Sequence, residues 1–275
     1  MSIIGNWTAT PNRAEMLIEF IKNENKQYKK IDLEELFTPQ SPSAFRENFN
    51  TLDSLRLIKI ENDIVKLNIE NSKLSILQVI KNSIFNDEFV YRDNFVYALA
   101  WLMIQDSNSI QDLDWQGQVN ILIKNDLNEN FSELDLTNNS SWQHFYYWCN
   151  YLGFATKSYI SNNVYVCPDP TEAILNELAL IFEEKKELKI NGFLKLLADR
   201  IPVLEFGSAR IKVMENVREG LSLAINQLSF ATSLALLRLE ERGIIKLEQK
   251  SDADSMSLKN SNEDRIISHI LYLGK

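Results

Sequence analysis

The sequence is poor in the residue types that build disulfide, metal and nucleotide sites. Its 275 residues include two cysteines, Cys149 and Cys167, and two histidines, His144 and His269. Two cysteines cannot form a disulfide framework or a four-ligand zinc site. Neither histidine stands in an HExxH motif or near the acids of a triad. The eight glycines form neither GxxxxGK[ST] nor GxGxxG. We therefore predict no metal, no cofactor, no small-molecule substrate and no catalytic residue.

Long apolar runs are missing as well. No stretch approaches the roughly 18 apolar residues that a membrane span requires. The opening MSIIGNWTATPNRAE lacks the basic start and apolar core of a signal peptide. With 45% hydrophobic and 24% charged residues, the chain has the composition of a globular protein long enough for two or three domains. We expect a cytoplasmic protein that makes no membrane contact.

Positive charge is scarce in the middle of the chain. The net charge is −9, and residues 1–70, 71–170 and 171–275 carry −2, −6 and −1 of it. A long-range field of this sign repels a polyanion. Any contact with nucleic acid would therefore be local and would use the terminal thirds.

Residues 31–68 carry the most informative pattern that is present. An acidic helix is predicted over residues 31–37, and the prolines of the following TPQSP turn prevent its continuation. Ser43 is a suitable N-cap for a second helix. Phe45 and Phe49 then recur at helical spacing, which predicts an apolar face on that helix.

The residues after this second helix predict a hairpin. The segments LIKI (57–60) and IVKLNI (64–69) alternate between apolar and polar residues, and END lies between them with turn chemistry. A hairpin that directly follows such a helix is typical of the wing of a winged helix. A predicted helix over residues 11–26 completes the unit.

The order of helix, cap, strand, polar turn and second strand occurs twice more. Helices predicted over residues 141–152 and 229–242 end at Gly153 and Gly243, and a strand follows each glycine. With Leu57 at the first junction, the periods are 96 and 90 residues (153 − 57 and 243 − 153). Further helices are predicted over residues 74–85, 89–104, 115–127, 132–136, 171–186, 192–201 and 208–217.

The predicted fold is mainly α with small β-hairpins (α+β), built from tandem winged-helix modules. We assign residues 1–70 to an N-terminal winged-helix domain and residues 71–170 to a central helical, winged-helix-like domain. Residues 171–275 are assigned to a C-terminal winged-helix-like domain.

The stretch LEELFTPQSPSAFRENFNTLDSLRLIKIENDIVKL resembles the helix-turn-helix and wing of bacterial winged-helix proteins. The whole chain, with its opening MSIIGNWTATPNRAEMLIEFI, is similar to accessory proteins of bacterial DNA-modification and phage-defence islands, notably protein G of the Dpd (7-deazaguanine in DNA) cluster. This resemblance implies a partner-binding or DNA-handling role in such an island, with other subunits of the system as partners.

One hypothesis is weak, sequence-tolerant binding of double-stranded DNA by the first and third modules. Arg, Lys and Asn side chains suit phosphates and base edges. Against it, the helix over residues 43–56 balances its two arginines with Glu47 and Asp53. The candidate DNA contacts are Arg46, Asn48, Asn50, Arg56, Lys59, Lys66, Arg210, Lys212, Arg218, Arg238 and Arg242.

The alternative is a non-enzymatic adaptor that binds proteins, as the acidic winged-helix subunits of SMC-type complexes do. The acidic middle and the aromatic helix over residues 141–152 favour it, because aromatic side chains anchor interfaces. Helical spacing puts two aromatic stripes on that helix, and one core contact cannot bury both. The candidate partner-binding residues are Trp142, Tyr146, Tyr147 and Tyr151.

A metal-dependent nuclease is the distant third reading. Asp169 followed by Glu183 and Lys185 matches a PD…ExK spacing, in which carboxylates hold Mg²⁺. Such nucleases carry ExK on a strand beside the Asp, whereas residues 183–186 are predicted to end a helix that begins at Thr171. This places the two parts about 20 Å apart at 1.5 Å per residue, so we predict a non-enzymatic protein.

Overall fold

The computed structural model describes residues 3, 9–23, 27–37, 42–69, 74–86, 94–106, 118–128, 134, 136, 138–160, 163–218, 226–251, 254–259 and 265–274. Helices dominate this part of the chain, and its named strands pair antiparallel in sheets of two or three strands. The predicted class, mainly α with small β-hairpins, is therefore confirmed.

The first unit consists of three helices and a small sheet. Its sheet has the strand order β1-β3-β2. Strand β1 was not predicted, because it is only two residues long and shows no alternation. The predicted residues 24–26 of the first helix and the turn at 38–41 lie outside the described residues. The elements are α1 (Pro11–Asn23), β1 (Tyr28–Lys29), α2 (Lys30–Phe37), α3 (Pro42–Ser54), β2 (Ile58–Glu61) and β3 (Ile64–Leu67).

Local chemistry explains where these elements begin and turn. Helix α3 begins at Pro42, so the prediction that Ser43 caps it is wrong. Proline suits the first helical position because its fixed φ is already helical and it has no N–H left unpaired. The hairpin turns at Asn62 and Asp63, whose φ values of 50° and 65° match a two-residue type I′ turn.

In the described residues, the central elements are four helices followed by a hairpin. Ser75 and Gln78 form a capping box at α4, and Asn138 caps α8 with Ser141 as its N3 partner. The helix therefore begins at Asn139, before the predicted start at residue 141. Parts of the predicted helices over 89–104, 115–127 and 132–136 lie outside the described residues. The elements are α4 (Ile76–Ile84), α6 (Asn94–Met103), α7 (Gln118–Asp126), α8 (Asn139–Tyr151), β4 (Ala155–Ile160) and β5 (Asn163–Pro168).

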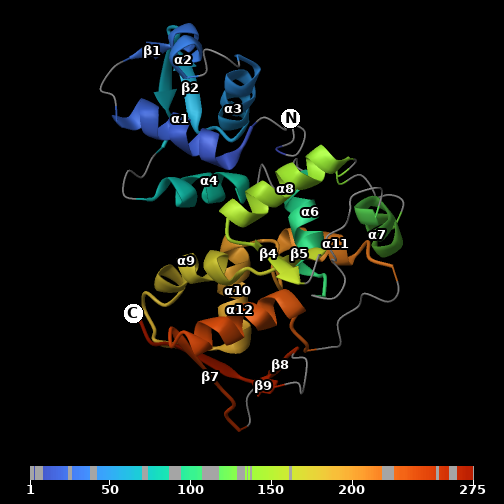
Figure 1. The fold of residues 1–275 in the computed structure, drawn as a ribbon. Coiled ribbons are helices and arrows are strands. Elements are labelled where there is room, and N and C mark those ends of the chain that lie inside the picture. Colours follow the sequence, from blue (N-terminus) through green and yellow to red (C-terminus); the bar gives the residue numbers. More distant parts are fainter. Residues whose placement is uncertain are drawn as a thin grey trace.

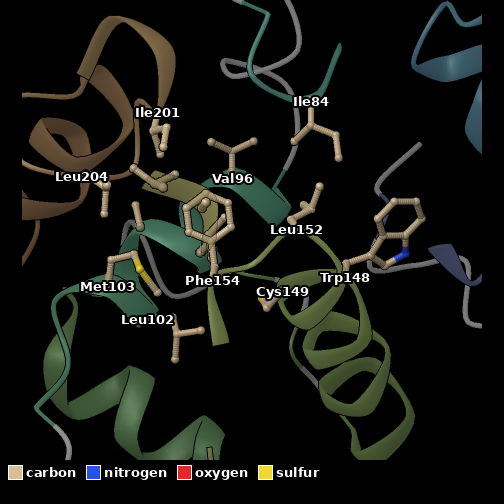
Figure 2. Close-up of a cluster of buried hydrophobic side chains, with 14 of the residues drawn as sticks. Ile84, Val96, Leu102, Met103, Trp148, Cys149, Leu152, Phe154, Ile201 and Leu204 are labelled. Carbon is tan, nitrogen blue, oxygen red and sulfur yellow. The ribbon is translucent and has the colours of Figure 1, made fainter. Parts of the chain in front are cut away.

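Helix α6 lies at the centre of the core. Its residues are buried on almost every side, as its nearly continuous apolar sequence predicts. Figure 2 shows side chains of α6 among residues from α4, α8, the start of β4 and the segment after α10. The central elements therefore share one hydrophobic core with the C-terminal elements.

The last unit repeats the element order of the first and adds two insertions. Its sheet order, β6-β10-β7, corresponds to β1-β3-β2. Helix α11 and the hairpin β8–β9 are the insertions, and β7 therefore pairs with β10 instead of the next strand along the chain. The elements are α9 (Thr171–Ile181), β6 (Glu187–Lys189), α10 (Ile190–Arg200), α11 (Ser208–Met214), α12 (Phe230–Glu241), β7 (Ile245–Glu248), β8 (Met256–Leu258), β9 (Arg265–Ile267) and β10 (His269–Tyr272).

A buried ion network joins the central elements to the last unit. The carboxylate of Glu177 on α9 is in contact with Lys81 Nζ from α4 and Arg200 Nε from α10. Glu177 and Lys81 are both buried. Burial lowers the pKa of Lys81, although the Glu177 carboxylate opposes that shift. Helix α4 therefore meets α9 and α10, which lie much later in the sequence, at one carboxylate.

The first unit contacts the rest through α1. Helix α1 packs against α4 and α8, and Figure 1 shows these two helices between the first unit and the C-terminal elements. Among the described residues, no helix is long and apolar enough to cross a membrane.

Candidate functional site

The two lysines of the first hairpin converge on one carboxylate. Lys59 and Lys66 are direct cross-strand partners, an arrangement that repels by itself because like charges face each other. Both ammonium groups contact Glu61, at 2.9 and 2.7 Å. Hydrogen bonds from Lys66 and Lys59 lower the pKa of Glu61 to about 2. Glu61 therefore neutralises part of the charge that would face a phosphate.

The arginine on the outer face of α3 is also paired within the unit. Arg46 Nε and Nη2 both lie 2.9 Å from Glu34 Oε1 on α2. Arg56 is exposed just after α3, with a left-handed φ of 56°, and its carbonyl accepts a hydrogen bond from Asn68. The four predicted basic contacts Arg46, Arg56, Lys59 and Lys66 are thus exposed, and Arg46, Lys59 and Lys66 are paired with carboxylates of the same unit.

The two asparagines of α3 differ in exposure. Asn48 is buried, and its amide donates to the Ala44 carbonyl oxygen at 2.7 Å. It cannot reach a base edge in this structure, which corrects its assignment as a DNA contact. Asn50 is half-buried. The helical pattern could not predict that Asn48 is more buried than Asn50, because a polar residue between apolar positions is expected at the surface.

Among the predicted basic residues of the last unit, one is buried and two are ion-paired. Arg210 is 4% exposed and lies inside, which corrects its assignment to a DNA surface. Arg238 is ion-paired with Asp169, and Arg242 Nη1 lies 2.6 Å from Glu172. Lys212 is exposed on α11.

Arg218 Nε donates to the carbonyl oxygen of Leu127 at 2.9 Å. Arg238 and Arg242 therefore link α12 to α9 and to the segment just before it, and Arg218 binds the segment after α7.

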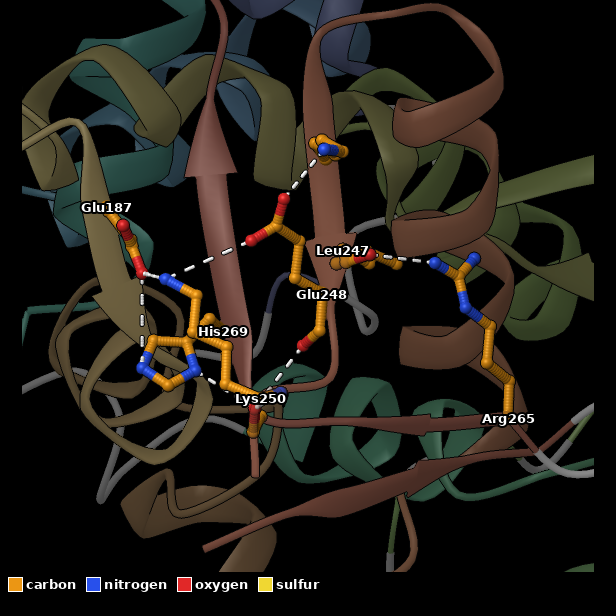
Figure 3. Close-up of polar contacts among 8 residues, drawn as sticks. Glu187, Leu247, Glu248, Lys250, Arg265 and His269 are labelled. Carbon is orange, nitrogen blue, oxygen red and sulfur yellow. Dashed lines mark hydrogen bonds and ion pairs between the residues drawn. The ribbon is translucent and has the colours of Figure 1, made fainter. Parts of the chain in front are cut away.

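The sheet of the last unit shows the same internal pairing. Figure 3 shows Lys250 between the carboxylates of Glu187 and Glu248, and His269 Nε2 lies 4.0 Å from Glu187. Arg265 contacts Glu240 and donates to the Leu247 carbonyl oxygen at 2.8 Å. Carboxylates therefore lie between the cations on this face and interrupt its positive charge.

Asp169, the first residue of the PD…ExK spacing, has structural partners. Its buried carboxylate accepts hydrogen bonds from the backbone N–H and hydroxyl of Thr171 and is paired with Arg238. Helix α9 ends at Ile181, so the prediction that it extends to residue 186 is wrong. Glu183 and Lys185 are exposed in the turn before β6. Across the described residues, no group of His, Cys, Asp and Glu side chains is arranged to hold a metal ion.

Most aromatic side chains of α8 are packed inside the protein. Trp142 is 5% exposed, and Phe145 and Trp148 are fully buried. The Phe145 ring lies 5.6 Å from the rings of both Trp142 and Phe95, the latter on α6. The assignment of Trp142 to an exposed partner-binding face is therefore corrected.

A second contact covers the side of α8 that faces the first unit. On the side of α8 toward the first unit, Trp148 Nε1 donates to the Ala9 carbonyl oxygen at 3.2 Å, and His144 Nε2 contacts the same oxygen. Tyr151 is half-buried beside Trp148. Burial, together with the nearby Glu15 carboxylate, raises the pKa of Tyr151. Helix α8 thus lies between α6 and the segment that leads into α1.

Three tyrosines and a lysine remain on the outer side of α8 and β4. Tyr147 is 49% exposed and Tyr159 is 75% exposed, while Tyr146 is half-buried with Lys157 Nζ 4.3 Å above its ring. The rings of Tyr146 and Tyr147 are 6.3 Å apart. Burial and then the neighbouring Tyr159 raise the pKa of Tyr146. We call Tyr146, Tyr147, Lys157 and Tyr159 the tyrosine patch.

Comparison with protein families finds a match over nearly the whole chain. Residues 1–253 match a family described as DpdG-like. The chain belongs to this DpdG-like family. No curated protein and no solved structure matches it. Membership associates the chain with a Dpd DNA-modification system.

Sequence reasoning about this DpdG-like chain missed Tyr159. The residue stands in the hairpin after α8, and only the packing of β4 against α8 brings it to Tyr146 and Tyr147. The available signal was the alternation of β4, because Lys157 and Tyr159 share a face of the strand. The alternation of β4 could not show which helix residues lie opposite Lys157 and Tyr159.

Proposed function

We propose that this DpdG-like chain is a non-enzymatic adaptor that binds other protein subunits of a Dpd system through the tyrosine patch. The observation that carries the proposal is the exposure of Tyr147 on α8 and Tyr159 on β4, whereas the larger aromatics of α8, Trp142, Phe145 and Trp148, are buried. Tyrosines are enriched at protein interfaces, where they bury a large area at a low cost in side-chain entropy. The partner is expected to cover this patch.

The proposal includes two winged-helix units that flank the central helices. Its support is the order helix, strand, helix, helix, strand, strand in the first unit, with the sheet order β1-β3-β2. The last unit has the same order and the sheet order β6-β10-β7 once α11 and β8–β9 are set aside. In the central region only the two-stranded hairpin β4–β5 corresponds to such a sheet within the described residues.

Charge defines the kind of partner that fits. Residues 71–170, which contain the patch, have a net charge of −6, and Lys157 already lies over Tyr146. A partner with apolar side chains surrounded by basic residues would complement this region. Such complementarity mainly accelerates association, so we expect the association rate to fall as salt is added.

The test is a binding assay with the proteins encoded in the native operon. The double variant Tyr147→Ala, Tyr159→Ala should reduce recovery of the partner at least about tenfold, as loss of interface anchors does. Its unfolding free energy should stay within about 0.5 kcal/mol of the parent, because both side chains are exposed. Trp142 is unsuitable for this test because its removal would empty a core position.

Ile121→Ala is the matched control, since Ile121 is an exposed apolar residue on α7, away from the patch. Full recovery of the partner is expected for this variant. Equal recovery by the parent, the control and the double tyrosine variant would contradict binding through the tyrosine patch.

Weak binding of duplex DNA by the first unit is the second candidate function. Its support is the exposure of Arg46 on α3, of Arg56 two residues after α3, and of Lys59 and Lys66 on the β2–β3 hairpin. The carboxylates of Glu34 and Glu61 compete with phosphate for three of these cations. We therefore propose that any duplex binding is weak and strongly reduced by salt.

A further inference from the structure

Strand β4 lies at one edge of its sheet, and its hairpin with β5 fixes the direction of its backbone groups. Within the described residues β4 pairs only with β5. Just before β4, the Phe154 carbonyl oxygen accepts a hydrogen bond from Asp169 N–H at 2.8 Å. The residues of an antiparallel strand alternately face the paired strand and the opposite side. The N–H and C=O groups of Lys157 and Tyr159 therefore point away from β5, and we call this side the open edge of β4.

A side chain caps only the start of the open edge. Asn150, near the end of α8, donates from Nδ2 to the Ala155 carbonyl oxygen at 3.0 Å. Across the part of the chain that the structure describes, no hydrogen bond engages the outward-facing backbone groups of Lys157 or Tyr159. Unpaired backbone groups at a strand edge can pair with another strand. The rest of the open edge therefore offers donors and acceptors to a further strand.

The corresponding edge of the last unit is closed by side chains. Counted from the glycine that ends the preceding helix, Leu247 of β7 stands at the same position as Lys157 of β4. The Leu247 N–H donates to Glu240 Oε1 at 2.8 Å, and its carbonyl oxygen accepts from Arg265 Nη2 at 2.8 Å. Glu240 and Arg265 are also paired with each other. The last unit thus occupies the backbone groups that the central hairpin leaves open.

The open edge adjoins the tyrosine patch, because Lys157 and Tyr159 belong to both. A lysine on an edge strand can discourage pairing, but here Lys157 Nζ lies 4.3 Å above the Tyr146 ring. A strand added at this edge would place every second side chain on the same face as Tyr159, which is 75% exposed. Such a strand would cover the patch while it pairs with the backbone.

Charge decides which kind of strand fits the open edge. Residues 71–170, which include β4, have a net charge of −6. A second copy of the chain would bring the same charge to the edge, and the two copies would repel each other. A segment of another protein with basic residues would instead be attracted.

We propose that the open edge of β4 binds an extended segment of the partner protein as an added antiparallel strand. This inference rests on the proposed adaptor function and states how the partner is held. Backbone groups of the segment pair with those of Lys157 and Tyr159, its apolar side chains pack on the tyrosine patch, and the side chains between them are basic. The antiparallel direction matches the named strand pairs of the described residues and gives the stronger ladder.

Amide hydrogen exchange of the intact chain tests whether the edge is open. Thr156 and Ser158, whose amides face β5, should exchange slowly. Lys157 and Tyr159 should exchange nearly as fast as in an unfolded chain, and the capped amide of Leu247 should exchange more slowly than that of Lys157. Slow exchange at both Lys157 and Tyr159 would mean that the edge is already covered and would overturn the proposal.

The peptide acetyl-KVKVKVK-amide is the probe for strand addition. It should slow exchange at Lys157 and Tyr159 but not at Val164 and Val166, which face the other edge of the hairpin. Directly opposite residues of an antiparallel pair share a face, so valines that lie on the patch point their N–H groups at β4. N-methylation of the valine amides should therefore weaken binding about tenfold or more, whereas N-methylation of the lysine amides should leave it unchanged.

Lys157→Pro tests the same hydrogen bonds from the side of the chain. Proline removes the outward-facing N–H without breaking a bond to β5, so the melting temperature should change little. Peptide binding and recovery of the partner should both fall about tenfold or more. Lys157→Thr is the matched control, because it removes the same ammonium group but keeps the N–H, and it should retain peptide binding. The N-methylated peptides use the parent chain, so the test does not depend on the folding of the proline variant.

Four results would overturn the proposal. The first is unchanged exchange at Lys157 and Tyr159 with millimolar peptide, and the second is slowed exchange at Val164 and Val166 instead. The third is equal affinity of the two N-methylated peptides, which would mean attraction to the acidic surface alone. The fourth is a dimer of the chain alone that Lys157→Pro abolishes, which would assign the edge to a second copy.

Recovery of the partner separates failure of this inference from failure of the proposed function. Loss of the partner in Tyr147→Ala, Tyr159→Ala but full recovery in Lys157→Pro would mean that side chains alone hold the partner, and only strand addition would be wrong. Full recovery in the double tyrosine variant would contradict the proposed function itself.

Discussion

The first and last units share an element order and a sheet order but place their charges differently. In the first unit, the ion pairs of Glu34 and Glu61 lie at the surface. In the last unit, Asp169, Glu177 and Glu205 are buried, and each holds a cation or a helix end from another segment. One arrangement of helices and strands is thus stabilised by surface pairs in the first unit and by both surface and interior ion pairs in the last.

This difference shows which unit is tied to the protein centre by charge. The last unit is joined to α4 through Lys81 and Glu177. The first unit is joined through apolar packing of α1 and through the Ala9 carbonyl, which contacts His144 and Trp148. Removal of a carboxylate should therefore destabilise the last unit strongly and the first unit hardly at all. The following predictions are in order of expected effect.

The largest effect is expected for Glu177→Ala. The change leaves Lys81 buried without its counter-charge, while Arg200, which is partly exposed, can turn to solvent. Breaking a buried pair from one side costs about 3–5 kcal/mol of unfolding free energy. Urea melts of the intact chain measure this loss.

The double variant Lys81→Met, Glu177→Leu is the control for that prediction. It removes both buried charges and fills the space with apolar groups, so its stability should stay close to that of the parent. An equally large loss in the double variant would contradict the assignment of the effect to an unpaired charge.

Phe49→Ala should destabilise the first unit by about 3 kcal/mol. The ring is buried, lies 5.6 Å from the Phe45 ring and has Lys30 Nζ 4.4 Å above it. Amide hydrogen exchange, compared between variant and parent, should become faster in α3 and β3 and change less in α12. A uniform increase over all three elements would instead mean that the two units unfold together.

Glu61→Gln should leave stability at pH 7 almost unchanged, since the pair is exposed, but it should release Lys59 and Lys66. Two additional phosphate contacts would steepen the plot of log affinity for duplex DNA against log salt by up to about 2. Asp63→Asn is the matched control, because it removes the same charge from the same turn and Asp63 has neither lysine as its ion-pair partner among the described residues. If the plot for Asp63→Asn steepened equally, the cause would be the change in net charge and not the release of the two lysines.

The same carboxylate predicts a small pH dependence. Its pKa is lowered from 4.5 to about 2 by the two lysines, so the folded state favours the ionised form. The stability that the pair contributes is present above about pH 4.5 and is lost as the pH falls toward 2. A difference in the pH profile between parent and Glu61→Gln over this window is the expected result, and its absence would contradict the pairing.

Much of this fold follows from local sequence signals. Apolar patterns located α3 and α6, and the helix predicted over residues 229–242 corresponds to α12. The turn at Asn62 and Asp63 was also evident from residue type. β1 and the pairing of β7 with β10 could not be predicted, because a two-residue strand has no period and the β8–β9 insertion separates the paired strands.

The candidate site was less predictable than the fold. Tyr147 was predicted on α8, but the burial of the α8 aromatics Phe145 and Trp148 involves Phe95 and Ala9, which lie far away in the sequence. The ion pairs of Arg46 and Arg238 likewise connect different elements. A basic residue can be identified in a sequence, whereas the carboxylate with which it forms an ion pair can be identified only in the folded chain.

The affinity of the intact chain for a nonspecific DNA duplex as a function of salt tests this picture most directly. Because most of the predicted basic contacts are ion-paired or buried, we predict no detectable binding near 150 mM salt and a slope of log affinity against log salt no steeper than about −2. A slope of about −6 or steeper, with binding that persists near 150 mM salt, would mean that these cations contact phosphates and would contradict an adaptor that binds mainly proteins.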